Sequence, residues 1–482
     1  MLWGIPSDVN SFFRSVCSDA SVPIRNALAP MVLAFLLAPH YRRLKTIAGM
    51  VLGHRVHVAT ISRRLVNPAW TTRDWYERSA RSVMAETDRF ERPLIKGRKR
   101  KFMIIIDATL HASVGEKMEN LLAMSKRKDP RRRNTRHHMF VMGLMITESG
   151  MRIPLTRRSY YTKEYCKAKN KKYRTQTQLA RLMIHDAPVP DDADVTVVYD
   201  SAFDADMIHR ECRNRGFREV FPIDPNRNLA TKDTPYAPAK AGAPVVASTL
   251  EWKDEEFETL ELEVENEDFV FFRRRHVDNL RVKKTFRRYV VAARCLAVSK
   301  LGSCLIVASY KENPKIELPP NESSDWRDYR HQLAKRRKKD QKKPSRWHGK
   351  VLACTDPNAT VREVIQWYEI RWQIEIFFRE LKSRMQLGCY VLMKFEAVER
   401  YIDLLLMGFL FLEKQRLNDI RKKGALPKKG DSESHWRTTD RLRSLEAALQ
   451  RFNLDYISQR IESKRGRAEL LRKLSDAPCQ VA

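Results

Sequence analysis

Two aspartates, Asp107 and Asp200, each follow a short apolar run that is rich in β-branched residues. Asp107 ends the sequence Phe-Met-Ile-Ile-Ile-Asp, and Asp200 ends the sequence Val-Thr-Val-Val-Tyr-Asp. Such runs predict central strands that are buried on both faces of a sheet. A carboxylate at the end of a buried strand is costly to desolvate unless it is paired or binds a cation. A salt-bridged strand end explains either acid alone, whereas two such acids in a basic protein favour a hard-cation site with oxygen ligands.

A divalent cation held by these acids would suit phosphodiester chemistry. It would activate a water or a 3′-hydroxyl and stabilise the leaving oxygen. Asp204 and Asp206 are further acids close to Asp200 in the chain. We rank them below Asp200 as ligands because they lie beyond the strand, at the helix predicted over residues 205–215.

A long helix is predicted from Val361 to about Leu387, and we expect it to supply the third acid. Thr360 and Glu363 form a capping-box pattern at its start, and Gly388 stands at its end.

At about 100° per residue, four residues of this helix fall within about 60° of one another on one face. They are Tyr368, Arg371, Glu375 and Lys382. One reading is a solvated face with an Arg371–Glu375 ion pair, worth a few tenths of a kcal/mol. The other is a face that aims Glu375 at a metal while its cationic neighbours bind phosphates. The residues alone leave both open.

The spacing of these four residues resembles the Tyr-Arg-Glu-Lys signature of bacterial insertion-sequence transposases of the DDE class, with every interval intact. Asp107 and Asp200 look like the first two acids of that family's triad. The resemblance covers roughly residues 25–413. It implies an RNase H-like core, in which a mixed sheet is flanked by helices and interrupted by a β-rich insertion before the Glu375 helix.

The same resemblance implies the roles of the site residues. Asp107, Asp200 and Glu375 would be the catalytic residues and the ligands of two Mg²⁺ ions, with Mn²⁺ able to substitute. The other three signature residues would bind DNA phosphates; they are Tyr368, Arg371 and Lys382. Arginine suits bidentate phosphate recognition and lysine supplies a point charge, so the residue types agree with these roles.

The function implied by the resemblance is that of a DNA transposase, which cuts and joins transposon-end DNA by metal-dependent phosphoryl transfer. That is cut-and-paste transposition of an insertion sequence. Its partners would be double-stranded transposon ends and target DNA, with a homodimer when two ends are paired. We expect such a protein in the bacterial cytoplasm, at the nucleoid when bound to DNA. Two alternatives remain: a domesticated, non-cleaving DNA-binding protein, and an RNase H-like nuclease without strand transfer.

The overall composition agrees with a nucleic-acid partner. Among 482 residues, 91 Lys and Arg oppose 59 Asp and Glu, which gives a net charge of +32. An excess of this size indicates a polyanionic partner. Apolar runs such as Met31–Ala38 and Leu404–Leu412 are far shorter than the ~20 residues of a membrane-spanning helix. Residues 1–10 lack a signal-peptide pattern. The eight cysteines form no CxxC pair, so we expect neither a zinc site nor a disulfide framework, in keeping with a reducing cytosol.

The pattern along the chain predicts an all-helical N-terminal domain, a core in two parts, an insertion and a helical C-terminal region. The predicted ranges are 1–95 for a helical DNA-binding domain, 96–225 and 349–413 for the RNase H-like core, 226–348 for the β-rich insertion and 414–482 for the C-terminal region. Within the first range, His40–Gly53 and His57–Leu65 have the layout of a helix-turn-helix, or of an ordinary helical hairpin. Alternating residues predict antiparallel strands of the insertion at four segments, Thr259–Glu265, Phe269–Arg273, Tyr289–Val298 and Ser303–Tyr310.

Several other residues suggest nucleic-acid contacts. The basic runs Lys126–Arg133 and Lys335–Lys343 are either solvated loops or contacts to the DNA backbone. His111 is expected in a loop, where DNA contact is the less favoured role. Related transposases stack a flipped base on a tryptophan of the insertion, and the candidates here are Trp252, Trp326 and Trp347.

Overall fold

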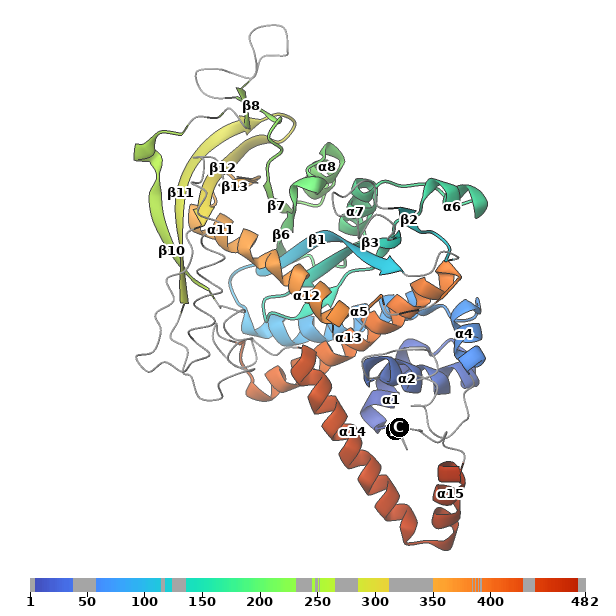
Figure 1. The fold of residues 1–482 in the computed structure, drawn as a ribbon. Helices are drawn as coiled ribbons and strands as arrows, with labels where there is room; N and C mark the ends of the chain where they lie inside the picture. Colours follow the sequence, from blue (N-terminus) through green and yellow to red (C-terminus); the bar gives the residue numbers. More distant parts are fainter. Residues whose placement is uncertain are drawn as a thin grey trace, which may run out of the picture. The chain divides into compact units, whose positions relative to one another are not determined.

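The structure is a computed structural model, drawn in Figure 1. It describes residues 5–37, 58–113, 118–123, 136–230, 245–247, 250, 252–264, 285–311, 350–383, 385, 387–388, 390, 392–427 and 438–475. The chain divides into two compact units. The first unit comprises Met1–Val197, Arg210–Phe217 and Arg371–Ala482, and the second comprises Val198–His209 and Arg218–Ile370.

The sheet of the first unit is built around β1 (Arg100–Ser113). This strand pairs antiparallel with β3 (Arg136–Ile146), from Met103 opposite Ile146 to Ser113 opposite Arg136. The short strands β2 (Leu122–Ala123), β4 (Arg152–Pro154) and β5 (Arg158–Ser159) also pair with β3. The neighbour of β1 on its other side is β6 (Ala193–Tyr199). Ile104, Ile105 and Ile106 are at most 1% exposed, so the apolar run before Asp107 is a buried strand, as predicted.

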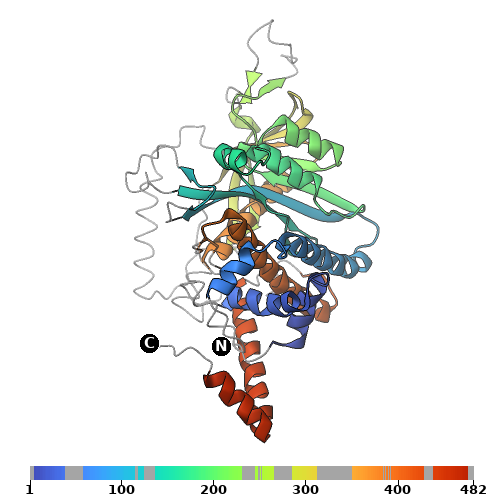
Figure 2. The ribbon, with the colours of Figure 1, turned by 90° about the vertical axis from the view of Figure 1, so that its right-hand side faces the viewer.

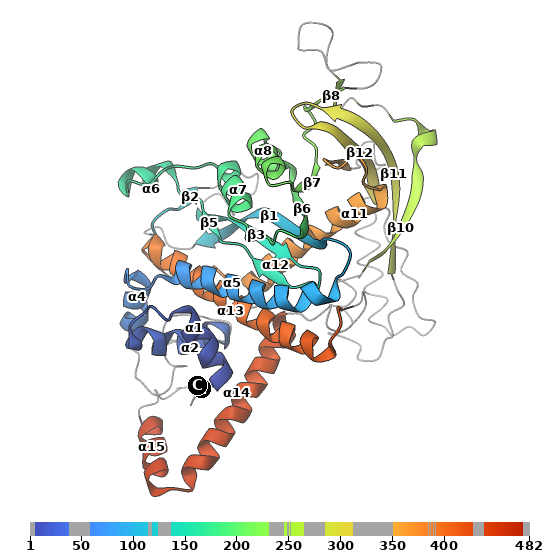
Figure 3. The ribbon, with the colours of Figure 1, turned by 180° about the vertical axis from the view of Figure 1, so that it is seen from behind.

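Helices cover both faces of this sheet. α7 (Gln176–His185) lies on the face opposite α5 (Thr72–Glu91) and α13 (Phe395–Lys423), as Figures 2 and 3 show. Helix α12 (Trp372–Ser383) packs against β1. Further helices of this unit are η1 (Arg92–Leu94), α6 (Lys163–Ala168), α14 (Thr438–Ile461) and α15 (Lys464–Ser475).

The apolar run Leu404–Leu412 is the buried middle of α13. It is covered by N-terminal helices, which include α1 (Ser7–Val16), α2 (Val22–Leu37) and α4 (Val58–Val66). The packing is close: a Cβ on Gly408 would lie 2.7 Å from Leu36 Cδ2. In the described part of the chain, no helix is both long and apolar enough to cross a membrane.

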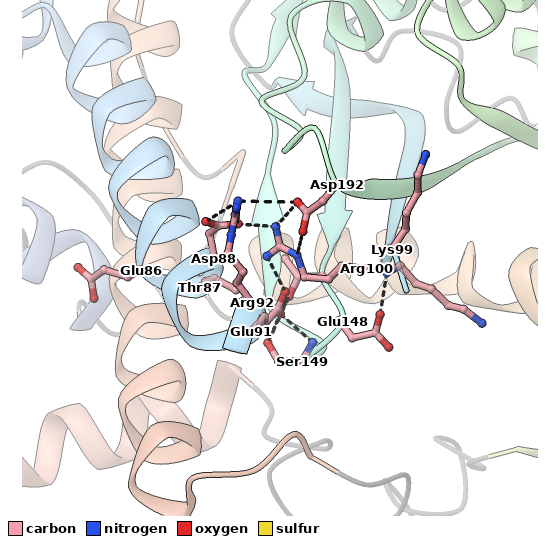
Figure 4. A network of polar contacts seen from close by, with 12 residues as sticks. Glu86, Thr87, Asp88, Glu91, Arg92, Lys99, Arg100, Glu148, Ser149 and Asp192 are labelled. Carbon is pink, nitrogen blue, oxygen red and sulfur yellow. Dashed lines mark hydrogen bonds and ion pairs between the residues drawn. The ribbon is translucent and has the colours of Figure 1, made fainter. Parts of the chain in front are cut away.

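A buried polar network joins the end of α5 to the start of β1 (Figure 4). The Arg100 guanidinium is 1% exposed and donates to Asp192, at 2.6 and 3.0 Å, and to Asp88. Glu91 accepts hydrogen bonds from the Ser149 backbone N–H, at 2.8 Å, and from the Thr147 hydroxyl. Burial raises the pKa of Glu91, against the lowering effect of these bonds. The network ties a helix of the predicted N-terminal domain directly to the central sheet.

The sheet of the second unit is antiparallel at each pairing described here. Its strands follow in the order β7 (Arg218–Pro222), β13 (Lys350–Cys354), β12 (Gly302–Lys311), β11 (Thr285–Val298), β8 (Asn228–Ala230) and β9 (Val245–Val246), while β10 (Glu258–Val264) pairs with β11. Three predicted alternating segments are confirmed as strands β10, β11 and β12; a fourth, Phe269–Arg273, lies outside the described residues. Because β12 pairs with β13, strands of the predicted insertion share one sheet with a strand assigned to the core. The domain division remains a prediction.

The remaining elements of the second unit are short. They are α11 (Val361–Ile370), η3 (Ser201–Phe203) and η5 (Asp254–Glu256). Helix α8 (Asp206–Asn214) follows η3 and ends before Gly216, whose φ is 65°.

Of the predicted helix-turn-helix, the second helix is confirmed by α4, while the first, His40–Gly53, lies outside the described residues. The basic runs Lys126–Arg133 and Lys335–Lys343 also lie outside the described residues.

Candidate active site

Asp107 lies in the middle of β1, which corrects the prediction that it ends a strand. The strand continues to Ser113 because the residues after Asp107 pair with the first half of β3; Asp107 itself is opposite Met142. Its Oδ1 accepts a hydrogen bond from the Ala108 N–H, at 2.7 Å. The side chain is half-buried, so one acid of the predicted triad stands on the central strand of the first unit's sheet.

The face of β1 that carries Asp107 continues with Thr109 and His111, since alternate residues of a strand share a face. Both side chains are buried, and neither Thr109 Oγ1 nor His111 Nε2 has a hydrogen-bond partner among the described residues. Burial, with a smaller effect of the Lys382 charge, lowers the pKa of His111 to about 3. His111 is therefore a neutral, buried strand residue, and the expectation of a loop histidine is wrong.

The long helix predicted from Val361 is two helices, α11 and α12, with Arg371 at the turn between them. Neither a proline nor a glycine marks this break, so the helical periodicity runs through it and did not predict it. The capping box is confirmed: the Thr360 N–H donates to Glu363 Oε2 at 3.0 Å, and the Glu363 N–H donates to Thr360 Oγ1 at 3.2 Å.

Three of the four signature residues lie in the first unit, at the start of α12 and along it. Arg371 Nη2 donates to Glu375 Oε1 at 2.6 Å. The Arg371 side chain is 12% exposed and the Glu375 side chain 33%, so this pair is half-buried and not a fully solvated one. Burial lowers the pKa of Lys382, and the negative charge of Asp107 opposes that effect. The charge of Lys382 therefore acts on the strand face that carries Asp107.

Helix α12 is fastened to the core by a buried charge cluster. Glu380 lies roughly 140° around the helix from Glu375, and its Oε2 accepts a hydrogen bond from Arg152 Nη1 at 3.0 Å. Arg152 also donates to Glu413 of α13, at 2.9 Å from its Nη2. Arg416, on the same helix, pairs with Glu413 at 3.2 Å. These contacts set the rotation of α12, and the sequence contained no local sign of them.

Tyr368 lies in the second unit, on α11, and its side chain is buried. Its hydroxyl accepts a hydrogen bond from Lys350 Nζ at 3.0 Å, and the same ammonium lies 4.8 Å from the centre of the tyrosine ring. Lys350, at the start of β13, is thus a cation beside Tyr368 that the sequence did not predict. Nothing in the local sequence links the two residues.

Asp200 directly follows β6, as predicted, and begins the turn η3; its Oδ1 accepts a hydrogen bond from the Ser201 N–H at 2.8 Å. The neighbouring acids are engaged elsewhere. Asp204 is 1% exposed and pairs with Arg227 and, at 2.8 Å, with His209 Nε2. Asp206 pairs with Lys300. Both acids therefore already have cationic partners, and the ranking of Asp200 above them stays a prediction.

His209 is held between two acids, which sequence analysis did not predict. Its Nδ1 lies 3.0 Å from Glu219 Oε1, and Glu219 also accepts a hydrogen bond from the Tyr199 hydroxyl at 2.6 Å. Burial lowers the pKa of His209, but the bonds to Asp204 and Glu219 outweigh it and raise the pKa above 6.5. The cluster fixes the segment that follows Asp200.

Of the three tryptophan candidates, only Trp252 lies in the described part of the chain. The Arg294 guanidinium carbon lies 4.9 Å from the centre of its ring, and Arg294 is itself held by Glu256. One face of this indole is therefore already covered by a cation.

Asp107 stands on β1, and Glu375 and Lys382 stand on α12, the helix that packs against this strand. Of the two α12 residues, Lys382 acts on Asp107 through its charge, while Asp200 and Tyr368 belong to the second unit. Within the described ranges, no group of three Asp, Glu, His or Cys side chains is arranged to hold a metal ion. The carboxylates of Asp107 and Glu375 are nevertheless oxygen donors of the kind that a hard cation takes.

A mixed sheet flanked by helices, with one acid on its central strand and another on the adjoining helix, defines an RNase H-like α/β protein. Residues 103–409 match the family model described as transposase DDE domain. This is more than half of the chain and includes the three predicted acids, so the chain belongs to the DDE transposase family. The predicted fold class and family are thereby confirmed. A comparison with curated proteins found no match.

Proposed function

We propose that this protein is a DNA transposase that cuts transposon-end DNA and joins it to target DNA by metal-dependent phosphoryl transfer, in a cut-and-paste reaction. The observation that carries the proposal is the arrangement on β1 and α12. There an acid on the central strand faces the charge of Lys382, and Glu375 lies on the same helix. A carboxylate beside cations is what a site needs if it must hold both a metal ion and a phosphodiester.

The third acid of the proposed site is Asp200. It follows Val197, the last residue of β6 in the first unit, by three positions. Three extended residues span at most about 11 Å, and β6 is the strand next to β1. The chain itself therefore limits how far Asp200 can lie from the strand that neighbours Asp107. We propose that Asp107, Asp200 and Glu375 act together as the catalytic carboxylates.

Transposases of this family generally use divalent metal ions, and the three oxygen-donor acids suit Mg²⁺, in a two-ion site, or Mn²⁺ in its place. When bound, such ions activate the attacking water or 3′-hydroxyl and stabilise the leaving oxygen. Glu375 Oε1 accepts a hydrogen bond from Arg371 Nη2, so a metal ion at Glu375 would either bind the other carboxylate oxygen or compete with Arg371 for this one. In either case a metal ion would weaken the hold of Glu375 on the Arg371 guanidinium, a group whose geometry suits the binding of a DNA phosphate.

The other signature residues position the DNA. Lys382 places a single positive charge beside Asp107, close to where the reacting phosphate must lie. Tyr368 and Lys350 offer a hydroxyl and an ammonium that already share a hydrogen bond. We propose that this pair binds one backbone phosphate, and that two copies of the protein act as a homodimer on paired ends. The site of action would be chromosomal DNA in the bacterial cytoplasm.

The test is a cleavage and joining assay with duplex DNA taken from the ends of the element that encodes the protein. Purified protein is incubated with end-containing or unrelated duplex and with Mg²⁺, Mn²⁺ or a chelator. We expect specific cleavage and joined products with either metal and none with the chelator. Cleavage without joining would favour the RNase H-like nuclease. Specific binding without cleavage in any metal would favour the domesticated DNA-binding protein.

A further inference from the structure

The segment around α6 presents a dense group of cations that is separate from the residues assigned above. Within residues 163–174, six side chains are basic and only Glu164 is acidic. The basic residues are Lys163, Lys167, Lys169, Lys171, Lys172 and Arg174; we call them the α6 platform. All are exposed except Lys171, which is half-buried. Figure 1 shows α6 beyond β2, at the edge of the first unit's sheet.

A tyrosine cluster beneath the platform contacts two of these cations, Lys163 and Lys171. Lys171 Nζ lies 4.5 Å from the centre of the Tyr161 ring, and Lys163 Nζ lies 5.6 Å from that of Tyr173. The hydroxyls of Tyr160 and Tyr173 share a hydrogen bond of 2.9 Å. A tyrosine hydroxyl is uncharged at neutral pH even at its ordinary pKa, and burial together with this bond raises the pKa of Tyr160 further, to about 12, so the hydroxyl does not repel an anion.

The backbone of the platform is also fixed at both ends. The Tyr165 N–H donates to Thr162 Oγ1 at 3.1 Å, which caps α6. At the other end, Thr175 and Gln178 form a capping box at the start of α7. Asn170, between the helices, has a φ of 49°, as in a tight turn. Cations held on an ordered scaffold lose less conformational entropy on binding than those of a flexible tail.

The chemistry of the platform fits the phosphate backbone of duplex DNA. A duplex carries one negative charge per about 1.7 Å of its axis, so closely spaced lysines neutralise several phosphates at once. Stable anchoring to a membrane would add an apolar face to the basic charges, whereas no large apolar side chain within residues 163–174 is exposed, and Tyr165 and Cys166 are buried. One lysine, Lys169, is partly neutralised by Glu119 at 3.6 Å.

We propose that the α6 platform is a second DNA-binding surface, which holds the backbone of duplex DNA independently of its sequence. This inference rests on the proposed function, since it assumes that DNA is the substrate. It adds a binding surface beyond Tyr368, Arg371 and Lys382. Either a transposon end or the target can supply the duplex, because both offer the same phosphates.

The test compares two variants that lose the same charge. The platform variant is K163Q/K167Q/K169Q/K172Q. It spares Lys171, which is half-buried and lies over two tyrosine rings, whereas Lys163 is exposed and lies over one. The control variant is K422Q/K423Q/R443Q/R451Q, which removes four exposed cations from α13 and α14. Affinity for end-containing and for unrelated duplex is measured at several salt concentrations, after thermal melting has shown that both variants are folded.

For the platform variant we expect weaker binding to both duplexes and a shallower dependence of log affinity on log salt. The slope should fall by about 0.9 for each phosphate that the variant no longer neutralises. In the control variant the slope should stay within about 0.9 of the wild-type value. An unchanged slope in the platform variant, or equal changes in both variants, would overturn the proposal. Weaker binding to the end-containing duplex alone would also overturn its sequence independence.

The wild-type protein distinguishes failure of this inference from failure of the proposed function. If wild type cuts end DNA with Mg²⁺ but the platform variant binds with an unchanged slope, the platform is wrong and the transposase assignment stands. If wild type binds DNA without cutting it, the slopes still decide the platform. Should wild type not bind duplex at all, both are wrong. If the variant with four substitutions unfolds at a lower temperature than wild type, the double variants K163Q/K167Q and K169Q/K172Q are tested in its place. For each of them the slope of log affinity against log salt should become shallower by up to about 1.8.

Discussion

Arg371 Nη2 donates a 2.6 Å hydrogen bond to Glu375 Oε1, one helical turn further along the chain. An exposed pair at this spacing contributes only a few tenths of a kcal/mol. Here the guanidinium is largely buried, at 12% exposed, so its solvation is already reduced and the carboxylate is its compensating charge. Both members of the pair are proposed site residues. Metal binding and phosphate binding should therefore be coupled through this contact.

Glu375→Gln should abolish cleavage while sparing DNA binding. The substitution keeps the shape and a polar tip but removes the charge that holds a cation. Binding should be equal or stronger, because the carboxylate no longer repels phosphates. A binding titration beside a cleavage assay with Mg²⁺ measures both properties, and Glu446→Gln, on the exposed face of α14, is the control for loss of one negative charge. Equal loss of binding and cleavage in a folded Glu375→Gln protein would make Glu375 a structural partner of Arg371 and not a metal ligand.

Arg371→Ala and Lys382→Ala should each weaken binding to end-containing DNA. Each removes one cation that binds a phosphate, so the salt dependence should become shallower by about one charge. Tyr368→Phe should be the mildest change, because it removes only a hydroxyl that Lys350 already contacts. Titrations at several salt concentrations provide the slopes. Slopes that match wild type in both alanine variants would contradict a role for this face in binding phosphates.

The stability of the second unit should fall as the pH rises above about 6.5, the ordinary pKa of histidine. The folded protein raises the pKa of His209, so its stabilising effect is complete below the pKa of the unfolded chain and is lost as the pH rises through the folded value. His209→Gln should flatten this dependence, whereas His185→Gln, at an exposed histidine, should retain it. The test is the midpoint of urea unfolding, measured for each protein from neutral to alkaline pH. The same pH dependence of this midpoint in wild type and in His209→Gln would contradict the prediction.

Arg152→Ala should destabilise the first unit by about 3–5 kcal/mol, because it leaves the carboxylates of Glu380 and Glu413 buried without their shared partner. The matched control is Arg98→Ala, which breaks an arginine–carboxylate pair with Glu148 whose guanidinium is about half exposed. An exposed pair is worth up to about 1 kcal/mol. Free energies of unfolding from chemical denaturation give both values. A similar small loss in the two variants would show that the cluster behind α12 does not hold that helix.

The sequence by itself determined the features that depend on neighbours in the chain. Apolar runs and alternating patterns predicted β1, β6 and the strands β10 to β12, because the side-chain period of a strand is local. The capping box at Thr360 and Glu363 likewise involves residues three positions apart. The spacing of the helix signature led to the family, which the match over residues 103–409 confirms.

The tertiary structure alone decided which distant residues meet. Asp107 stands inside a strand because β3 pairs beyond it. His111 is uncharged chiefly because it is buried in the folded chain, with a smaller effect of the Lys382 charge. The partner of Arg152 at Glu413 is 261 positions away, and no local pattern encodes such a pair. The break at Arg371 carries no proline or glycine. Local periodicity is set by backbone geometry, whereas burial and ion pairing depend on which segments pack together, and for that reason only the folded chain revealed them.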